Sequence, residues 1–126
     1  MAKACPDDVL DTFLDEIALA DIEQVCSGQP ANYAGIAAVS LADVALTPGD
    51  GNGDFTIGNG DSSGRKVTVA QQADVDIDAS GTATHVALAD AGNTRLLYVT
   101  TCTSQALTDT GTVTIPAWDI EIADPS

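Results

Sequence analysis

One glycine-rich loop, DGNGDFTIGNGD, places carboxylate and amide side chains at a spacing that suits calcium. Asp50, Asn52 and Asp54 occupy the first, third and fifth positions of an EF-hand loop, and Asp61 occupies the twelfth. An EF-hand needs glycine at the sixth position for its sharp turn and a bidentate glutamate at the twelfth, whereas this loop has Phe55 and Asp61 there. The loop is therefore predicted to be a solvated turn, and Asp50, Asn52, Asp54 and Asp61 are weak candidates for a metal site.

A second acidic group follows a strand pattern. Asp74, Asp76 and Asp78 alternate with Val75 and Ile77. Alternate residues of a strand point to the same face about 7 Å apart, so the three carboxylates could hold a divalent cation if a loop added carbonyl groups. A hydrated face that discourages edge-to-edge strand pairing is the simpler interpretation.

Residues able to catalyse a reaction are sparse. The segment 60–66, GDSSGRK, lacks the spacing and the Gly-Lys-Ser/Thr ending of a phosphate-binding loop. His85 is the single histidine, and Cys5, Cys26 and Cys102 are widely spaced without a CxxC pair, which favours free thiols. We therefore expect a non-enzymatic protein with no cofactor.

The charge balance limits the possible partners. Sixteen of the nineteen acidic residues are aspartate, four residues are basic, and the net charge is −15. Such a chain repels nucleic acid and anionic membranes, and no apolar run reaches the ~18 residues of a membrane span or forms an export signal. The scarce cations Arg65, Lys66 and Arg95 are expected to form ion pairs, either within the domain or across a subunit contact.

An amphipathic helix should begin the chain. Pro6, Asp7 and Asp8 are typical of a first helical turn, and apolar residues follow at three- and four-residue spacing. The pattern predicts a helix of about 18 residues that ends at Gly28 and Pro30, within an N-terminal arm and helix at residues 1–35.

From residue 36 the apolar period changes to two, and turn sequences separate short apolar segments. We predict a mainly β domain over residues 36–126, an antiparallel sandwich or small barrel of seven or eight strands, which together with residues 1–35 makes a single compact domain overall. Residues 96–99 are apolar on both faces, as expected of a central strand. The predicted core residues are Val67, Val69, Val86, Leu88, Leu97, Val99, Val113 and Ile115.

Five segments carry a resemblance to a known group: DFTI at 54–57, SGRKVTVA at 63–70, ATHVALAD at 83–90, TRLLYVTT at 94–101 and VTIPAWDIEI at 113–122. They resemble small acidic structural proteins encoded among the head and tail genes of tailed bacteriophages, especially siphophages of marine alphaproteobacteria. The resemblance implies a virion protein, most often a capsid decoration or cement protein, and assigns no residue a role.

On this interpretation the protein is made in the host cytoplasm and lies on the capsid exterior. Its partner is the major capsid protein, and self-association, with a trimer favoured, is a second possibility. The expected contact residues combine the apolar helix face with the cations: Phe13, Leu14, Ile17, Arg65, Lys66 and Arg95. The alternatives are a head-tail connector, a tail or head-fibre component and, from another class, a calcium-dependent adhesion or binding module.

Overall fold

The computed structural model describes residues 5–123, so residues 1–4 of the predicted arm and residues 124–126 lie outside the described part. Helices α1 (Asp7–Ile17) and α2 (Tyr33–Val39) and a short 3-10 helix η1 (Ala91–Asn93) accompany the strands. Within residues 5–123 the nine strands are β1 (Ile22–Cys26), β2 (Ser40–Ala45), β3 (Phe55–Asn59), β4 (Arg65–Val69), β5 (Gln72–Asp76), β6 (Gly81–Asp90), β7 (Arg95–Leu107), β8 (Thr112–Ile115) and β9 (Trp118–Ile122). The predicted mainly β class with a helix at its start is confirmed.

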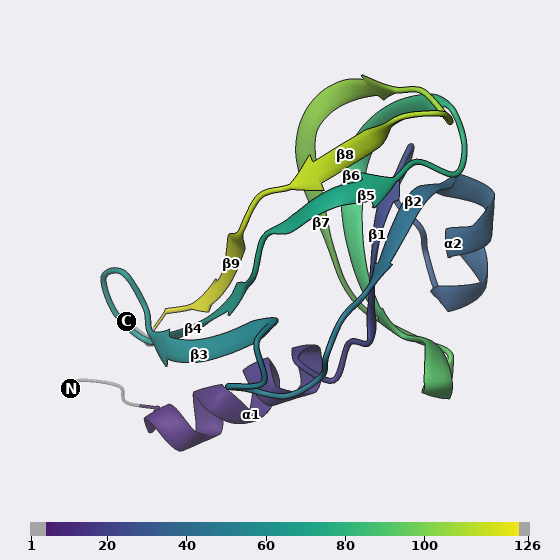
Figure 1. The fold of residues 1–126 in the computed structure, drawn as a ribbon. Coiled ribbons are helices and arrows are strands. Elements are labelled where there is room, and N and C mark those ends of the chain that lie inside the picture. The colour runs from purple at the N-terminus through teal and green to yellow at the C-terminus, as the bar shows by residue number, and fades with distance from the viewer. Residues whose placement is uncertain (1–4, 124–126) are drawn as a thin grey trace.

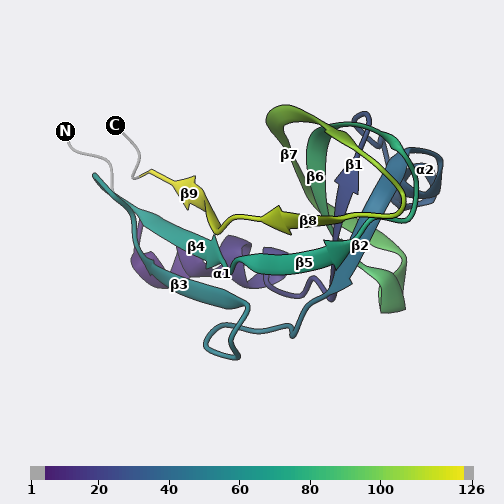
Figure 2. The ribbon, with the colours of Figure 1, turned by 45° about the horizontal axis from the view of Figure 1, so that its top comes forward.

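The strands form three open sheets, and every strand pair is antiparallel. The largest sheet has the order β2-β1-β6-β7, a second has the order β3-β4-β9, and β5 pairs with β8. Because β4 leads into β5 and β8 leads into β9, the two smaller sheets form one long bent ribbon (Figure 2). Helix α1 lies along the β3-β4-β9 end, and α2 lies beside the four-stranded sheet (Figure 1).

Helix α1 is shorter than predicted. It starts after Pro6 and ends at Ile17, and the segment 22–26 forms strand β1. The segment pairs with β2 on one side and β6 on the other, so its backbone hydrogen bonds come from neighbouring strands. Tertiary pairing therefore overrides the helical propensity of 22–26, where the apolar residues had already drifted from one helical face.

Residues 5–35 and the β-rich part that follows them are structurally joined. Strand β1 lies inside the four-stranded sheet, and α2 spans residues 35 and 36. The side chain of Asn32 begins α2 by accepting a hydrogen bond from the Gly35 N–H at 2.8 Å. The first 35 residues thus contribute to the same fold as the strands.

Strand β7 is an edge strand, so the prediction that residues 96–99 form a central strand is wrong. These residues are apolar on both faces because Leu97 and Tyr98 pack on one core cluster while Leu96 and Val99 pack on another. All four are only partly buried. The interior strands of the four-stranded sheet are β1 and β6, and the fully buried Leu88 lies on β6.

Three apolar clusters hold the elements together. The largest joins α1, the β3-β4-β9 sheet and the four-stranded sheet around Leu14, Phe55 and Leu88. A second lies between the four-stranded sheet and the β5-β8 pair, and a third lies under α2. Of the eight predicted core residues, Leu97, Val99 and Val113 are partly buried, and the other five are buried.

Candidate functional site

Two of the predicted contact cations tie α1 to the strands. The Arg65 Nε donates to the Asp11 carboxylate at 2.7 Å, and an Arg95 guanidinium nitrogen donates to Glu16 at 3.1 Å. Both acids lie on α1, whereas Arg65 lies on β4 and Arg95 on β7. The Asp11 carboxylate, through its hydrogen bond, raises the pKa of Arg65 further above its ordinary value.

The third cation, Lys66, pairs across the ribbon. Its Nζ donates to Asp61 at 2.8 Å and to Asp119 at 3.3 Å, and these bonds raise the pKa of Lys66. Arg65, Lys66 and Arg95 therefore all pair within the chain. Among residues 5–123, no Lys or Arg is left without a carboxylate partner, so the unpaired charge of the described surface is carried by carboxylates.

The apolar face of α1 is divided between the core and the surface. Leu14 and Ile17, both predicted contact residues, are 0% and 3% exposed and pack into the protein's own core. Phe13 is 51% exposed, and Val9, one turn earlier, is 55% exposed. Val9 and Phe13, four residues apart on one side of the helix, form the α1 outer patch.

The polar side chains of the loop that carries the weak metal candidates already form hydrogen bonds within the chain. Asp50 accepts from the Ile57 N–H at 2.8 Å, and Asp54 accepts from the Thr47 N–H at 2.6 Å and from Gln72 at 3.0 Å. Asn52 donates to a backbone carbonyl, and Asp61 binds Lys66. Among residues 5–123, no group of three His, Cys, Asp or Glu side chains is placed to hold a metal ion.

The second acidic group is less regular than its alternation predicts. The pairing of β5 with β8 shifts between Gln72 and Val75, and Asp74 has the left-handed φ of 55°. Asp74, Asp76 and Asp78 are all exposed. Partial burial raises the pKa of Asp43, and the negative charge of Asp78 raises it further, so some crowding of carboxylates adds to the effect of burial.

This crowding predicts how ions affect stability. Sodium chloride should raise the melting temperature, because screening weakens repulsion within a chain of net charge −15. Calcium chloride at equal ionic strength should add little, because the loop oxygens already bind backbone and side-chain groups. Thermal melts in the two salts provide the measurement, and a large calcium-specific rise would contradict the assignment of the loop as a solvated turn.

A buried carboxyl, which sequence reasoning missed, links two sheets. Glu23 on β1 is 0% exposed, and its Oε2 accepts from the Trp118 Nε1–H at 2.8 Å. Its Oε1 has no hydrogen-bond partner in the described structure. Burial raises the pKa of Glu23 to about 7, the Trp118 bond opposes this rise, and Asp54 adds to it. No sequence pattern indicates this burial, because Ile22, Glu23, Gln24 and Val25 do not alternate in polarity and the segment lies within the predicted helix.

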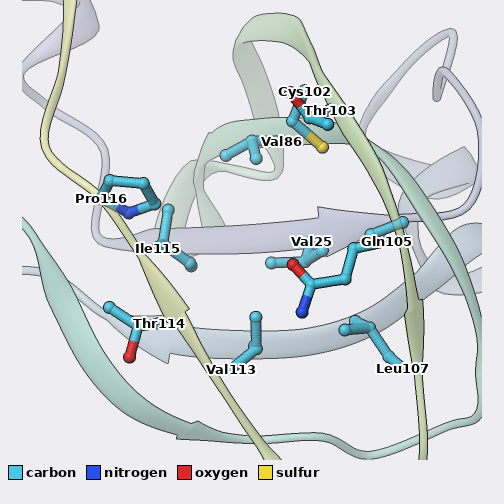
Figure 3. Close-up of a pocket in the computed structure, with 11 residues that line it drawn as sticks. Val25, Val86, Cys102, Thr103, Gln105, Leu107, Val113, Thr114, Ile115 and Pro116 are labelled. Atoms are coloured by element: carbon cyan, nitrogen blue, oxygen red, sulfur yellow. The ribbon is translucent and has the colours of Figure 1, made fainter.

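An apolar groove runs between β7 and β8 (Figure 3). Val25 and Val86 form its floor, Cys102, Gln105 and Leu107 line the β7 side, and Val113, Ile115 and Pro116 line the other side. This part has a volume of about 200 Å³, and an adjoining hollow of about 240 Å³ extends it to Trp118 and Asp119. The two share Val86, Cys102, Ile115 and Pro116, so we treat them as one feature, the β7–β8 groove.

The thiols and the single histidine of residues 5–123 lie apart from one another in the sequence, and Cys26 and His85 have local partners. Cys5, Cys26 and Cys102 are free thiols, and burial raises the pKa of Cys26 to about 11. The half-buried His85 has its Nδ1 2.8 Å from the Thr84 hydroxyl. No helix in the described part of the chain is long and apolar enough to cross a membrane.

Comparison with known proteins gives no match: no family model, no curated protein and no solved structure is similar to this chain. The molecule is thus defined by its own features, as a mainly β, strongly acidic domain with an exposed apolar helix patch and an apolar groove.

Proposed function

We propose that this chain is a non-enzymatic capsid decoration protein that binds the major capsid protein on the outside of a tailed-phage head. The observation that carries the proposal is the division of its surface. The described cations are paired within the chain, most of the described carboxylates are exposed, and Val9 and Phe13 remain exposed together. A decoration protein needs such a division, because its outer face must stay hydrated at high local concentration while another face makes contact.

Apolar contact suits this molecule better than ion pairing. Arg65, Lys66 and Arg95 already have carboxylate partners, so using them at a capsid would require breaking those pairs. Burying the α1 outer patch gains about 25 cal/mol per Å² of apolar surface without such a cost. Val9 and Phe13 therefore replace Leu14 and Ile17 as the helix residues for the contact.

Copy number in purified particles tests the proposal against its structural alternatives. A shell lattice places on the order of hundreds of decoration subunits on each particle, whereas a connector ring holds about six to twelve. Quantitative mass spectrometry of virions, together with a cryo-electron map, gives this number. A ring-like number would support the head-tail connector, and absence from the particle would refute a virion role. A trimer in solution or on the shell would support the expected self-association.

Point substitutions test the contact. Replacing Val9 and Phe13 together by serine should reduce binding to capsids that lack this protein by about tenfold, because the apolar contact is lost. The melting temperature should change little, because both side chains are about half exposed. Co-sedimentation with the capsids measures the binding.

Leu19→Ser is the matched control, because Leu19 is an exposed apolar residue, 42% exposed, outside the patch. Deleting residues 1–28 would be a poorer test, since it removes Leu14, Ile17 and β1 from the core. Wild-type binding by the double variant would show that α1 is not the anchor. Failure of the unaltered protein to bind would contradict decoration itself.

A further inference from the structure

Strands β7 and β8 are neighbours that do not pair. A four-residue turn joins them, a connection typical of a β-hairpin, and the Gly111 N–H closes this turn on the Thr108 carbonyl at 2.9 Å. Yet β7 pairs with β6, and β8 pairs with β5. In the described chain, each of the two strands therefore has one edge without a strand partner.

These two edges face a single gap in a curved succession of strands. The β5-β8 pair meets the four-stranded sheet at β2, through the Ala42–Ile77 bridge and a 2.8 Å bond from the Asp78 N–H to the Leu41 carbonyl. The strands then follow the order β8, β5, β2, β1, β6 and β7. The gap between the first and the last of these strands is the β7–β8 groove.

We propose that the β7–β8 groove accepts an extended segment of a partner polypeptide, with apolar side chains at alternate positions, no carboxylate inside the groove and a basic residue at one or both ends. The segment would add a strand where pairing is missing, as in β-augmentation. Main-chain hydrogen bonds to the two edges would provide affinity, and the groove floor would select the side chains.

The floor of the groove suits inward-pointing apolar side chains. Val25, Val86 and Ile115 supply an aliphatic surface, and the inner part alone has a volume of about 200 Å³. A bound water needs about 10 to 15 Å³ of such space, so the groove can hold far more than a single water. Gln105 reaches over the groove between the two strands, where its amide can bond a segment backbone (Figure 3).

The charges around the groove favour a segment whose middle is uncharged and whose ends carry lysine or arginine. In a chain of net charge −15, Asp109 is the only charged residue between Leu96 and Trp118. Asp109 lies in the turn that closes one end of the groove. Asp119 lines the other end and shares the single ammonium of Lys66 with Asp61, so this end keeps a net negative charge. Carboxylates at both ends favour lysine or arginine on the occupant and oppose an acidic segment.

The walls of the groove favour an extended segment over an edge strand of a second folded copy. An edge strand in a folded domain has its own sheet on one side and can approach only an open edge. Here β8 stands opposite the β7 edge, so the entering chain must fit between two strands of the acceptor (Figure 3). A single extended chain meets that requirement.

This inference goes beyond the proposed function. A peptide-binding groove would give a decoration protein a second contact with its partner. Purified protein and synthetic peptides test the groove without capsids. A failed capsid-binding assay and a failed peptide assay are therefore separate results.

The test uses the full chain and the peptide acetyl-Lys-Val-Thr-Val-Thr-Val-Lys-amide. Cys102 lines the groove, whereas Cys5 precedes α1, so alkylation by a maleimide at pH 8.5 compares a groove thiol with an internal reference. Bound peptide should slow alkylation of Cys102 about tenfold and leave Cys5 unchanged. It should also shift the fluorescence of Trp118, the single tryptophan. Two altered peptides serve as controls. The first is N-methylated at alternate residues, so it keeps the side chains but loses backbone N–H donors. The second has glutamate in place of the terminal lysines, which reverses the charge at its ends.

Both altered peptides should bind about tenfold more weakly. Gln105→Leu removes the amide that would bond the segment backbone, with little change in size or charge, and should weaken binding, whereas Gln71→Leu, the same change at an exposed position outside the groove, should not. If the N-methylated peptide bound as tightly as the unmodified peptide, strand addition would be refuted, and the groove would bind side chains alone. No protection of Cys102 would overturn the acceptor site, and protection of Cys102 through concentration-dependent dimerisation without peptide would make a second copy the occupant.

Discussion

Replacing Leu88 by alanine should destabilise the protein by about 3 to 5 kcal/mol, whereas the same replacement at Leu97 should cost only about 1 to 2 kcal/mol. Leu88 is 0% exposed on the interior strand β6, so its truncation leaves a cavity in the largest core cluster. Leu97 packs on the same cluster from the edge strand β7, where it is only partly buried. Surrounding groups and water can fill part of the space that its truncation leaves.

Urea unfolding of the two variants at one pH and one salt concentration measures this difference. Each variant loses the same atoms from the same residue type, so the comparison isolates the environment of the side chain. A larger loss at Leu97 than at Leu88 would contradict the strand order β2-β1-β6-β7.

Replacing Glu23 by glutamine should make the protein more stable relative to wild type as the pH rises. Burial raises the pKa of Glu23 from 4.5 to about 7, so the folded state keeps its proton at a pH where the unfolded chain has lost it. The stability that neutral Glu23 contributes is complete below about pH 4.5 and falls until the pH passes about 7. Glutamine cannot ionise, and the variant should therefore gain about 3 kcal/mol relative to wild type between pH 4.5 and pH 8.

The measurement is the difference in unfolding free energy between Glu23→Gln and wild type at several pH values. The difference matters because many other carboxylates also titrate in this range. Glu121→Gln, at an exposed glutamate on β9, is the control and should show a much smaller pH dependence. A constant difference for Glu23→Gln across the range would show that Glu23 is ionised in the folded state.

The sequence by itself predicts the elements that depend on local chemistry. Pro6 and the carboxylates of Asp7 and Asp8 fit the start of α1. The N–H groups of a first turn have no acceptor within the helix, so a proline there loses no hydrogen bond and negative charge is favoured. The alternation around Val67 and Val69, and the change of face at Pro116, correspond to β4, β8 and β9. Each signal lies within a few residues of the feature it predicts.

The candidate sites were less predictable, because they depend on the pairing of distant segments. Phe13, Leu14 and Ile17 share an apolar pattern, and only packing against β4 and β7 separates exposed Phe13 from the buried pair. Likewise, Arg65 meets Asp11 across 54 positions of sequence, and Glu23 meets Trp118 across 95. No local pattern encodes such distances.

Composition determined the acidic surface, the scarcity of cations and the mainly β class, because these follow from residue types and short-range periodicity. The tertiary structure alone decided that 22–26 is an interior strand, that β7 is an edge and that β7 and β8 leave a groove between them. A strand's place in a sheet is set by which partners satisfy its backbone hydrogen bonds, and those partners come from elsewhere in the chain.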